Sequence, residues 1–159
     1  MAYYAHTGLI ADNLPDSAED DATIWLFVDN FRQRRVLNFL RNAADYGALS
    51  APLLRAVSDF LRTDMILHIL SEEKDLFPLL RSRCSPEDHL DRLLDRLARD
   101  HEAEREAIAQ IGNGLRLLPV GAVAAPLSPE LRHLITAFVE AMKWHIIDEN
   151  TLLLPLVRG

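Results

Sequence analysis

Four long segments place their apolar residues at intervals of three or four, and this spacing constrains the fold more than any other feature of the chain. The segments cover approximately residues 17–44, 51–83, 85–113 and 127–155. Such spacing puts the apolar side chains of each segment on one helical face. No long stretch alternates like a strand, and the links between segments are short or moderate. We therefore predict an all-α fold, an up-down-up-down antiparallel four-helix bundle.

Prolines and capping residues mark the expected helix ends. Ser85 and Ser128 each precede Pro-Glu, a sequence that is typical of a capped first helical turn. Pro78 lies near the end of the second segment, where we expect it to kink or end the helix. Pro155 is expected to break the fourth helix. Residues 117–126 (LLPVGAVAAP) form an apolar connector between the third and fourth segments.

Composition indicates one compact domain in a reducing compartment. The chain has 159 residues, of which 49% are hydrophobic, and its 17 Lys and Arg against 24 Asp and Glu give a net charge of −7. This acidity argues against a nucleic-acid partner, and no apolar run approaches the about 20 residues that span a bilayer. The single cysteine, Cys84, forms no internal disulfide and no signal peptide is apparent, so we expect a cytoplasmic protein. We assign residues 1–16 to an irregular N-terminal segment and residues 17–159 to one helical domain.

The apolar stripe of each segment is interrupted by polar residues that carry metal-ligand chemistry or a close substitute for it. The pattern His-x-x-x-Glu occurs twice, in the second and fourth segments, and each copy is followed by an apolar pair around a proline. If the four helices align, all the interruptions meet at one level of the bundle. They are Asn30, His68, Glu72, His101, His145 and Glu149.

Burying these carboxylates and imidazoles without compensation would cost several kcal/mol per charge. Bound metal provides one form of compensation. The i, i+4 spacing places each His and Glu on one helical face, about 6 Å apart at the Cβ atoms, so that a carboxylate can bridge two ions while the imidazole binds one. Imidazole with carboxylate suits iron, manganese or zinc. A dense hydrogen-bond network is the alternative, in which Asn30 and Gln33 would bond the histidines of a metal-free structural bundle.

Several nearby titratable residues receive no site role. His6, His89 and His133 are interpreted as exposed or as satisfied by ordinary contacts. Glu73, Asp75 and Asp148 adjoin the two motifs but lie at the edge of the stripe, where we expect solvated side chains. The chain also offers no separate pairing of a nucleophile with a base, so catalytic residues stay unassigned.

The chain resembles the hemerythrin-like, or HHE, cation-binding domain family over nearly its whole length from about Ala22 onward. The resemblance rests on FVDNFRQRRVLNFL, LHILSEEKDLFPLLRSRC, LARDHEAERE and WHIIDENTLLLPL. It implies a four-helix bundle with a non-haem di-iron centre that binds or senses oxygen or a related small ligand such as NO or peroxide. By position, it implies the metal ligands His68, Glu72, His101, His145 and Glu149, with the two glutamates as candidate bridges.

Two positions depart from the family pattern. The first-helix histidine of the family falls on Asn30, a poor iron ligand, and Arg105 stands where oxygen-carrying hemerythrins tend to place a further histidine. One metal position is therefore expected to be weak, open to water or substrate, or empty. Such a lopsided centre fits a sensor, an oxygen- or peroxide-reactive enzyme, or a non-functional relic better than reversible oxygen carriage.

Overall fold

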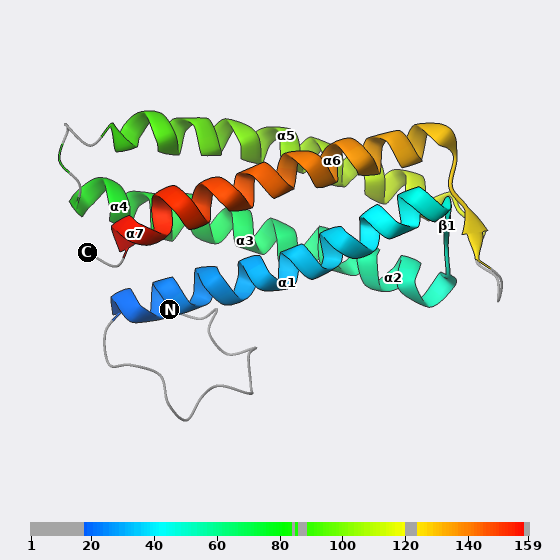
Figure 1. Cartoon of the computed structure of the whole chain (residues 1–159), viewed down its shortest axis with the longest axis horizontal. Coiled ribbons are helices and arrows are strands. Elements are labelled where there is room, and N and C mark those ends of the chain that lie inside the picture. Colours follow the sequence, from blue (N-terminus) through cyan, green and yellow to red (C-terminus); the bar gives the residue numbers. More distant parts are fainter. Residues whose placement is uncertain (1–17, 84, 86–88, 120–123, 158–159) are drawn as a thin grey trace, which may run out of the picture.

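The computed structural model describes residues 18–83, 85, 89–119 and 124–157, and these form four helical rods side by side (Figure 1). The first rod is α1 (Ala18–Tyr46) and the third is α5 (Leu90–Arg116). The second joins α2 (Ala51–Phe60), η2 (Leu61–Met65), α3 (Ile66–Ser71), η3 (Glu72–Leu76) and α4 (Phe77–Arg83). The fourth joins α6 (Pro129–Asp148), η5 (Glu149–Leu153) and α7 (Leu154–Val157). Successive rods run in opposite directions, which confirms the predicted four-helix bundle.

The second and fourth rods continue through their prolines, because a π-helical turn precedes each one. In η3 the N–H of Phe77 donates to the carbonyl of Glu72, five residues back. In η5 the N–H of Leu154 donates in the same way to the carbonyl of Glu149. The wider turn accommodates the proline, which has no N–H to donate. The prediction that Pro155 breaks the fourth helix is therefore wrong, since α7 extends beyond it to Val157.

The fourth rod begins where the sequence predicts, whereas α5 of the third rod begins later than predicted. Ser128 caps α6 as expected, since its hydroxyl oxygen accepts a hydrogen bond from the N–H of Leu131 at 3.1 Å. In contrast, α5 begins only at Leu90, because His89 has a left-handed backbone with φ of 51°. Residues 84 and 86–88, on which the expected Ser-Pro-Glu start depends, lie outside the described residues, as do residues 1–17.

A short strand pair joins two links at one end of the bundle, although no strand was expected. The first rod ends at Tyr46, and the next residue, Gly47, has a φ of 72°, the left-handed conformation that favours glycine after a helix. Next along the chain, β1 (Ala48–Leu49) pairs antiparallel with β2 (Ala125–Pro126), which belongs to the apolar connector. This pairing ties the first link of the bundle to the last.

The core consists of two apolar clusters. One includes Leu37, Ile69, Ile108 and Met142, and the other includes Leu26, Leu76, Leu97 and Leu153. Both clusters contain residues from all four rods. On every rod, a stretch of sequence without cluster residues separates the part in one cluster from the part in the other.

Eight buried polar side chains, two from each rod, lie in these stretches or directly beside them in the sequence, and we call them the polar layer. Its members are Asn30, Gln33, His68, Glu72, His101, Glu104, His145 and Glu149. Within the described part of the chain, no helix is both long and apolar enough to cross a bilayer.

Replacing Ser128 with Ala should lower the free energy of unfolding by about 1 kcal/mol, because the N–H of Leu131 loses its capping acceptor. Urea denaturation followed by circular dichroism measures the change. Thr136→Ala is the control, since the Thr136 hydroxyl donates to the Arg132 carbonyl within the same helix and caps no free N–H. Equal midpoints for wild type and Ser128→Ala would refute the capping role.

Candidate metal centre

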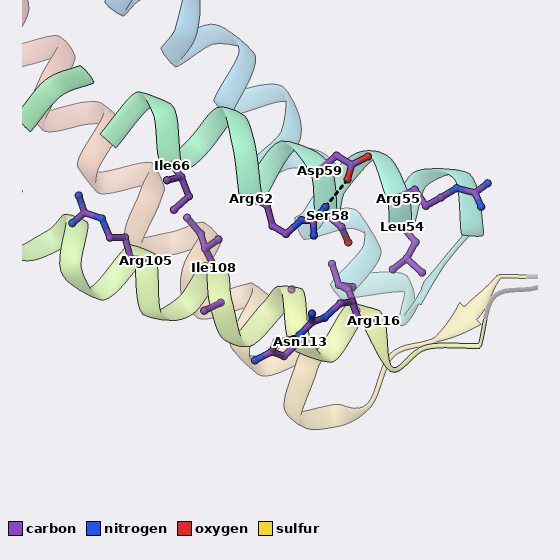
Figure 2. A pocket seen from close by; sticks show the side chains of 13 residues that line it. Leu54, Arg55, Ser58, Asp59, Arg62, Ile66, Arg105, Ile108, Asn113 and Arg116 are labelled. Carbon is purple, nitrogen blue, oxygen red and sulfur yellow. Dashed lines mark hydrogen bonds and ion pairs between the residues drawn. The ribbon is translucent and has the colours of Figure 1, made fainter. Parts of the chain in front are cut away.

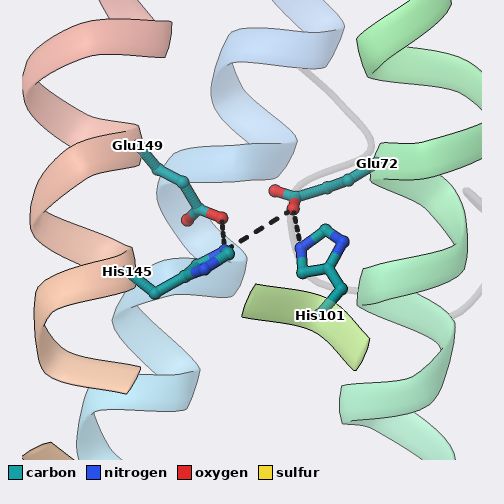
Figure 3. Close-up of side chains that lie close together, drawn as sticks. All are labelled: Glu72, His101, His145 and Glu149. Atoms are coloured by element: carbon teal, nitrogen blue, oxygen red, sulfur yellow. Dashed lines mark ion pairs between the residues drawn. The ribbon is translucent and has the colours of Figure 1, made fainter. Parts of the chain in front are cut away.

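The five side chains predicted as metal ligands all lie in the polar layer. Each is at most 3% exposed. His68 comes from α3, His101 from α5 and His145 from α6, while Glu72 and Glu149 are the first residues of η3 and η5. The two His-x-x-x-Glu motifs thus have matching local structure, with the glutamate beginning a π-helical turn in both. Three rods supply the cluster, and α1 passes beside it (Figure 3).

Four of these residues form one compact donor set. The Nε2 atom of His145 lies 2.6 Å from Oε1 of Glu149, and Nε2 of His101 lies 3.1 Å from Oε2 of Glu72. The same Glu72 oxygen lies 4.0 Å from Nε2 of His145. One donor atom from each of the four residues falls within 4.8 Å of the others. Two nitrogen and two carboxylate oxygen donors around one point suit a single transition-metal cation.

His68 lies within 4 Å of the same two carboxylates. Its Nε2 atom lies 3.4 Å from Oε1 of Glu72 and 3.9 Å from Oε1 of Glu149. Glu72 therefore presents one oxygen to His68 and the other to His101 and His145. A carboxylate placed in this way has the geometry of a bridge between two adjacent metal positions.

Each of the three histidines has a second carboxylate behind it. The Nδ1 atom of His101 forms a hydrogen bond with Oε1 of Glu73 at 3.0 Å. Nδ1 of His68 lies 2.7 Å from Oδ2 of Asp29, and Nδ1 of His145 lies 3.1 Å from Oε1 of Glu104. A carboxylate at Nδ1 favours a proton on that nitrogen and leaves the Nε2 lone pair directed into the cluster.

The sequence did not predict that these outer carboxylates contact the histidines. Glu73 was expected to be solvated, yet it contacts both His101 and Arg105. Asp29 and Glu104 were not singled out at all. For Glu104 a signal existed, because it follows His101 by three residues and so shares its helical face. Asp29 gave no comparable signal, since its partner His68 comes from another rod.

Arg105 does not take the place of a histidine ligand. Its Nη2 atom donates to Oε2 of Glu73 at 2.5 Å, on the far side of that carboxylate from His101. Partial burial raises the pKa of Glu73, but Arg105 and His101 outweigh that effect and hold it below its usual value. Arg105 therefore keeps Glu73 ionised and in position against His101.

Aromatic rings restrain two of the imidazoles. Trp25 stacks on His68 with ring centroids 5.4 Å apart. Phe77 stacks on His101 at 5.5 Å with an interplanar angle of 5°. Together with the outer carboxylates, these contacts limit how far the imidazole rings can turn, which is the preorganisation that a metal site needs.

The electrostatics of the layer favour positive charge at its centre. Burial lowers the pKa of His145, but Glu149, Glu72 and Glu104 outweigh it and raise that pKa to about 11. Burial also lowers the pKa of His68, but nearby carboxylates, chiefly Glu72, outweigh it and raise that pKa well above its usual value. Burial raises the pKa of Glu149, yet His145 and His68 bring it well below its usual value. A metal cation would take the place of protons that these carboxylates already attract.

Asn30 and Gln33 complete the layer from α1, and their side chains make no hydrogen bonds within the described structure. They are 2% and 1% exposed, and none of their amide nitrogen or oxygen atoms has a partner. The hydrogen bonds to the histidines that a metal-free layer would require are therefore not formed. Both oxygens of Glu72 and the Nε2 atoms of all three histidines likewise lack a hydrogen-bond partner in the described residues. This set of buried, inward-facing donors fits a metal cation.

The two described histidines without an assigned role are not part of the layer. His89 and His133 are exposed, and His6 is outside the described residues. Asp75 is exposed as expected. Asp148 pairs with Arg96 at 2.9 Å and is about a quarter exposed.

Comparison with known protein families gives a match over most of the chain. The family model described as Hemerythrin HHE cation binding domain matches residues 25–157. That span contains all eight members of the polar layer. No curated protein and no solved structure matches the chain.

Glu104→Gln should weaken metal binding by about 10- to 100-fold, because His145 loses the charged partner that orients its ring. Competition against a chromophoric chelator measures the affinity. Glu102→Gln, an exposed change on the same helix, is the control and should bind as wild type. If Glu104→Gln bound metal as tightly as Glu102→Gln, the orienting role would be refuted.

Proposed function

Because the chain belongs to the hemerythrin HHE cation-binding domain family, we propose that it is a non-haem iron protein that binds or senses a small ligand such as oxygen, NO or peroxide. The metal ligands in this proposal are His68, Glu72, His101, His145 and Glu149. The observation that carries it is the convergence of three Nε2 atoms and two carboxylates in a buried layer. Iron fits this nitrogen and oxygen donor set, as would manganese or zinc.

In this proposal the ligand residues hold two adjacent metal positions. Glu72, His101, His145 and Glu149 would hold the first cation, and the carboxylates would neutralise its charge. His68 and the same two carboxylates would hold the second. Iron in such a centre supplies redox chemistry and open coordination sites. The protein's part is to fix the imidazoles through Asp29, Glu73 and Glu104 and to exclude water with the two apolar clusters on either side.

Asn30 makes the centre asymmetric in this proposal. It stands at the family's first-helix histidine, next to Asp29, which contacts His68. The second position therefore has one imidazole where the first has two. A position with fewer protein ligands leaves room for a small ligand, which favours sensing or reaction over a saturated storage site.

A metal-dependent enzyme acting on oxygen or peroxide is a second candidate, favoured by the same asymmetry at Asn30. Sustained consumption of hydrogen peroxide by the iron-loaded protein, lost in Glu149→Ala, would support the enzyme. Binding of NO or oxygen without turnover would support the sensor.

Glu72→Ala and Glu149→Ala should each abolish stoichiometric iron, because both glutamates contact histidines on more than one rod. Elemental analysis of the purified protein gives the metal content. Asp75→Ala, which removes an exposed acid from the rod that carries Glu72, should keep the wild-type iron content. Iron unchanged in both glutamate variants would rule out the proposed site.

Asn30→His should raise the iron content toward two per chain, because it adds an imidazole to the position that has only His68. Titration with iron(II) under anaerobic conditions measures the stoichiometry. Asn38→His, an exposed change on the same helix, controls for adventitious binding by an added histidine. Identical stoichiometry in the two variants would mean that α1 contributes no ligand position.

A further inference from the structure

A surface groove of about 600 Å³ lies between α2–η2 and α5, apart from the polar layer. We call it the arginine groove, because Arg55, Arg62, Arg105 and Arg116 line it (Figure 2). Arg55 and Arg116 stand at one end, while Arg105 and Ile66 stand at the other. A hollow of this volume is in the range that holds small organic ligands.

The groove is cationic on a chain whose net charge is −7. Asp59 is the one acidic residue among those that line it, against four arginines. Arg62 pairs with Asp59 at 3.2 Å, and Arg105 pairs with Glu73 at 2.5 Å. Two of the four guanidinium groups are therefore already neutralised by carboxylates.

Arg55 and Arg116 have no carboxylate partner among the described residues. The side-chain contact of Arg116 is with the neutral amide oxygen of Asn113. Arg55 makes no ion pair or side-chain hydrogen bond within the described structure. These two guanidinium groups are thus not neutralised by a carboxylate of the described residues. Guanidinium groups in this state can bind carboxylates and phosphates through paired, charge-assisted hydrogen bonds.

The rest of the groove is largely apolar. Leu54, Leu115 and Ile108 are buried side chains along it, and Ile66 is half-buried near the Arg105 end. Arg116 follows Arg105 by eleven positions on one helix, which corresponds to about 16 Å along the helix axis. At Gly112, a residue that lines the groove, an added Cβ atom would meet nothing within 4 Å. Open space therefore exists beside this helix, over an apolar floor.

We propose that the arginine groove binds an amphipathic organic anion with a medium-length hydrocarbon chain. The anionic head lies at the end of the groove near Arg55 and Arg116, within reach of their flexible side chains. The hydrocarbon body runs over Leu115 and Ile108 toward Ile66. The proposal stands on the charge and shape of the groove and does not rest on metal at the polar layer.

Isothermal titration calorimetry with decanoate tests this assignment in the full-length protein. We expect one decanoate per chain and no binding of decyltrimethylammonium, which has the same chain and the opposite charge. Arg55→Gln and Arg116→Gln should each lower the affinity about tenfold, the loss expected for one charge-assisted contact. Arg99→Gln, an exposed change on α5 outside the groove, should leave it unchanged. Equal binding of decanoate and decyltrimethylammonium would overturn the proposal.

A second pair of variants tests the cavity itself. Gly112→Phe should abolish decanoate binding by filling the groove, while Gly112→Ala should bind as wild type because its methyl group meets open space. Circular dichroism melts check that both variants fold. Undiminished binding in a folded Gly112→Phe would overturn the proposal. So would binding to anionic phosphatidylglycerol vesicles without any binding of monomeric decanoate, since a membrane surface would then be the partner.

Discussion

The cost of burying charge between two apolar clusters is the constraint on which the rest of this structure depends. The polar layer holds three carboxylates and three imidazoles with almost no access to water. Each ionised group removed from water costs several kcal/mol unless it is paired, whereas a whole domain is stable by only about 5–15 kcal/mol. The outer carboxylates beside the three Nδ1 atoms offset part of this cost. The Nε2 atoms and the oxygens of Glu72 and Glu149 lack hydrogen-bond partners in the described residues, and a bound cation would offset the rest.

The sequence predicted the bundle and the centre of its polar layer, because both depend on local helical spacing. His68 and Glu72 meet since they are four residues apart on an inward face, and the same holds for His145 and Glu149. The role of Asp29 was not predicted, because its contact with His68 joins two different rods and depends on how each rod is oriented about its own axis. The continuation past Pro155 was missed for another reason: the π-helical turn of η5 leaves no periodic signal of its own. Localisation in the cytoplasm stays a prediction.

Asn30 links the layer to its proposed chemistry. In the proposed centre, an amide where the family is expected to have an imidazole would keep the position polar but would remove a strong iron ligand. Because Asn30 and Gln33 find no hydrogen-bond partner among the described side chains, their burial is hard to explain by structural stability alone. It is explained if their amides face the open side of a metal centre, where a small ligand binds. The arginine groove is a separate feature, although Arg105 touches both regions through Glu73.

The melting temperature of the purified protein before and after exhaustive chelation tests the central claim most directly. A cation present at about 1,000 times its dissociation constant stabilises the folded state by about 4 kcal/mol. For a chain of this size, that corresponds to a shift of about 8–16 °C. We predict that chelation lowers the melting temperature by this amount and that added iron restores it. The same melting temperature with and without chelator would contradict the account, because a cation that compensates the buried charges must stabilise the fold.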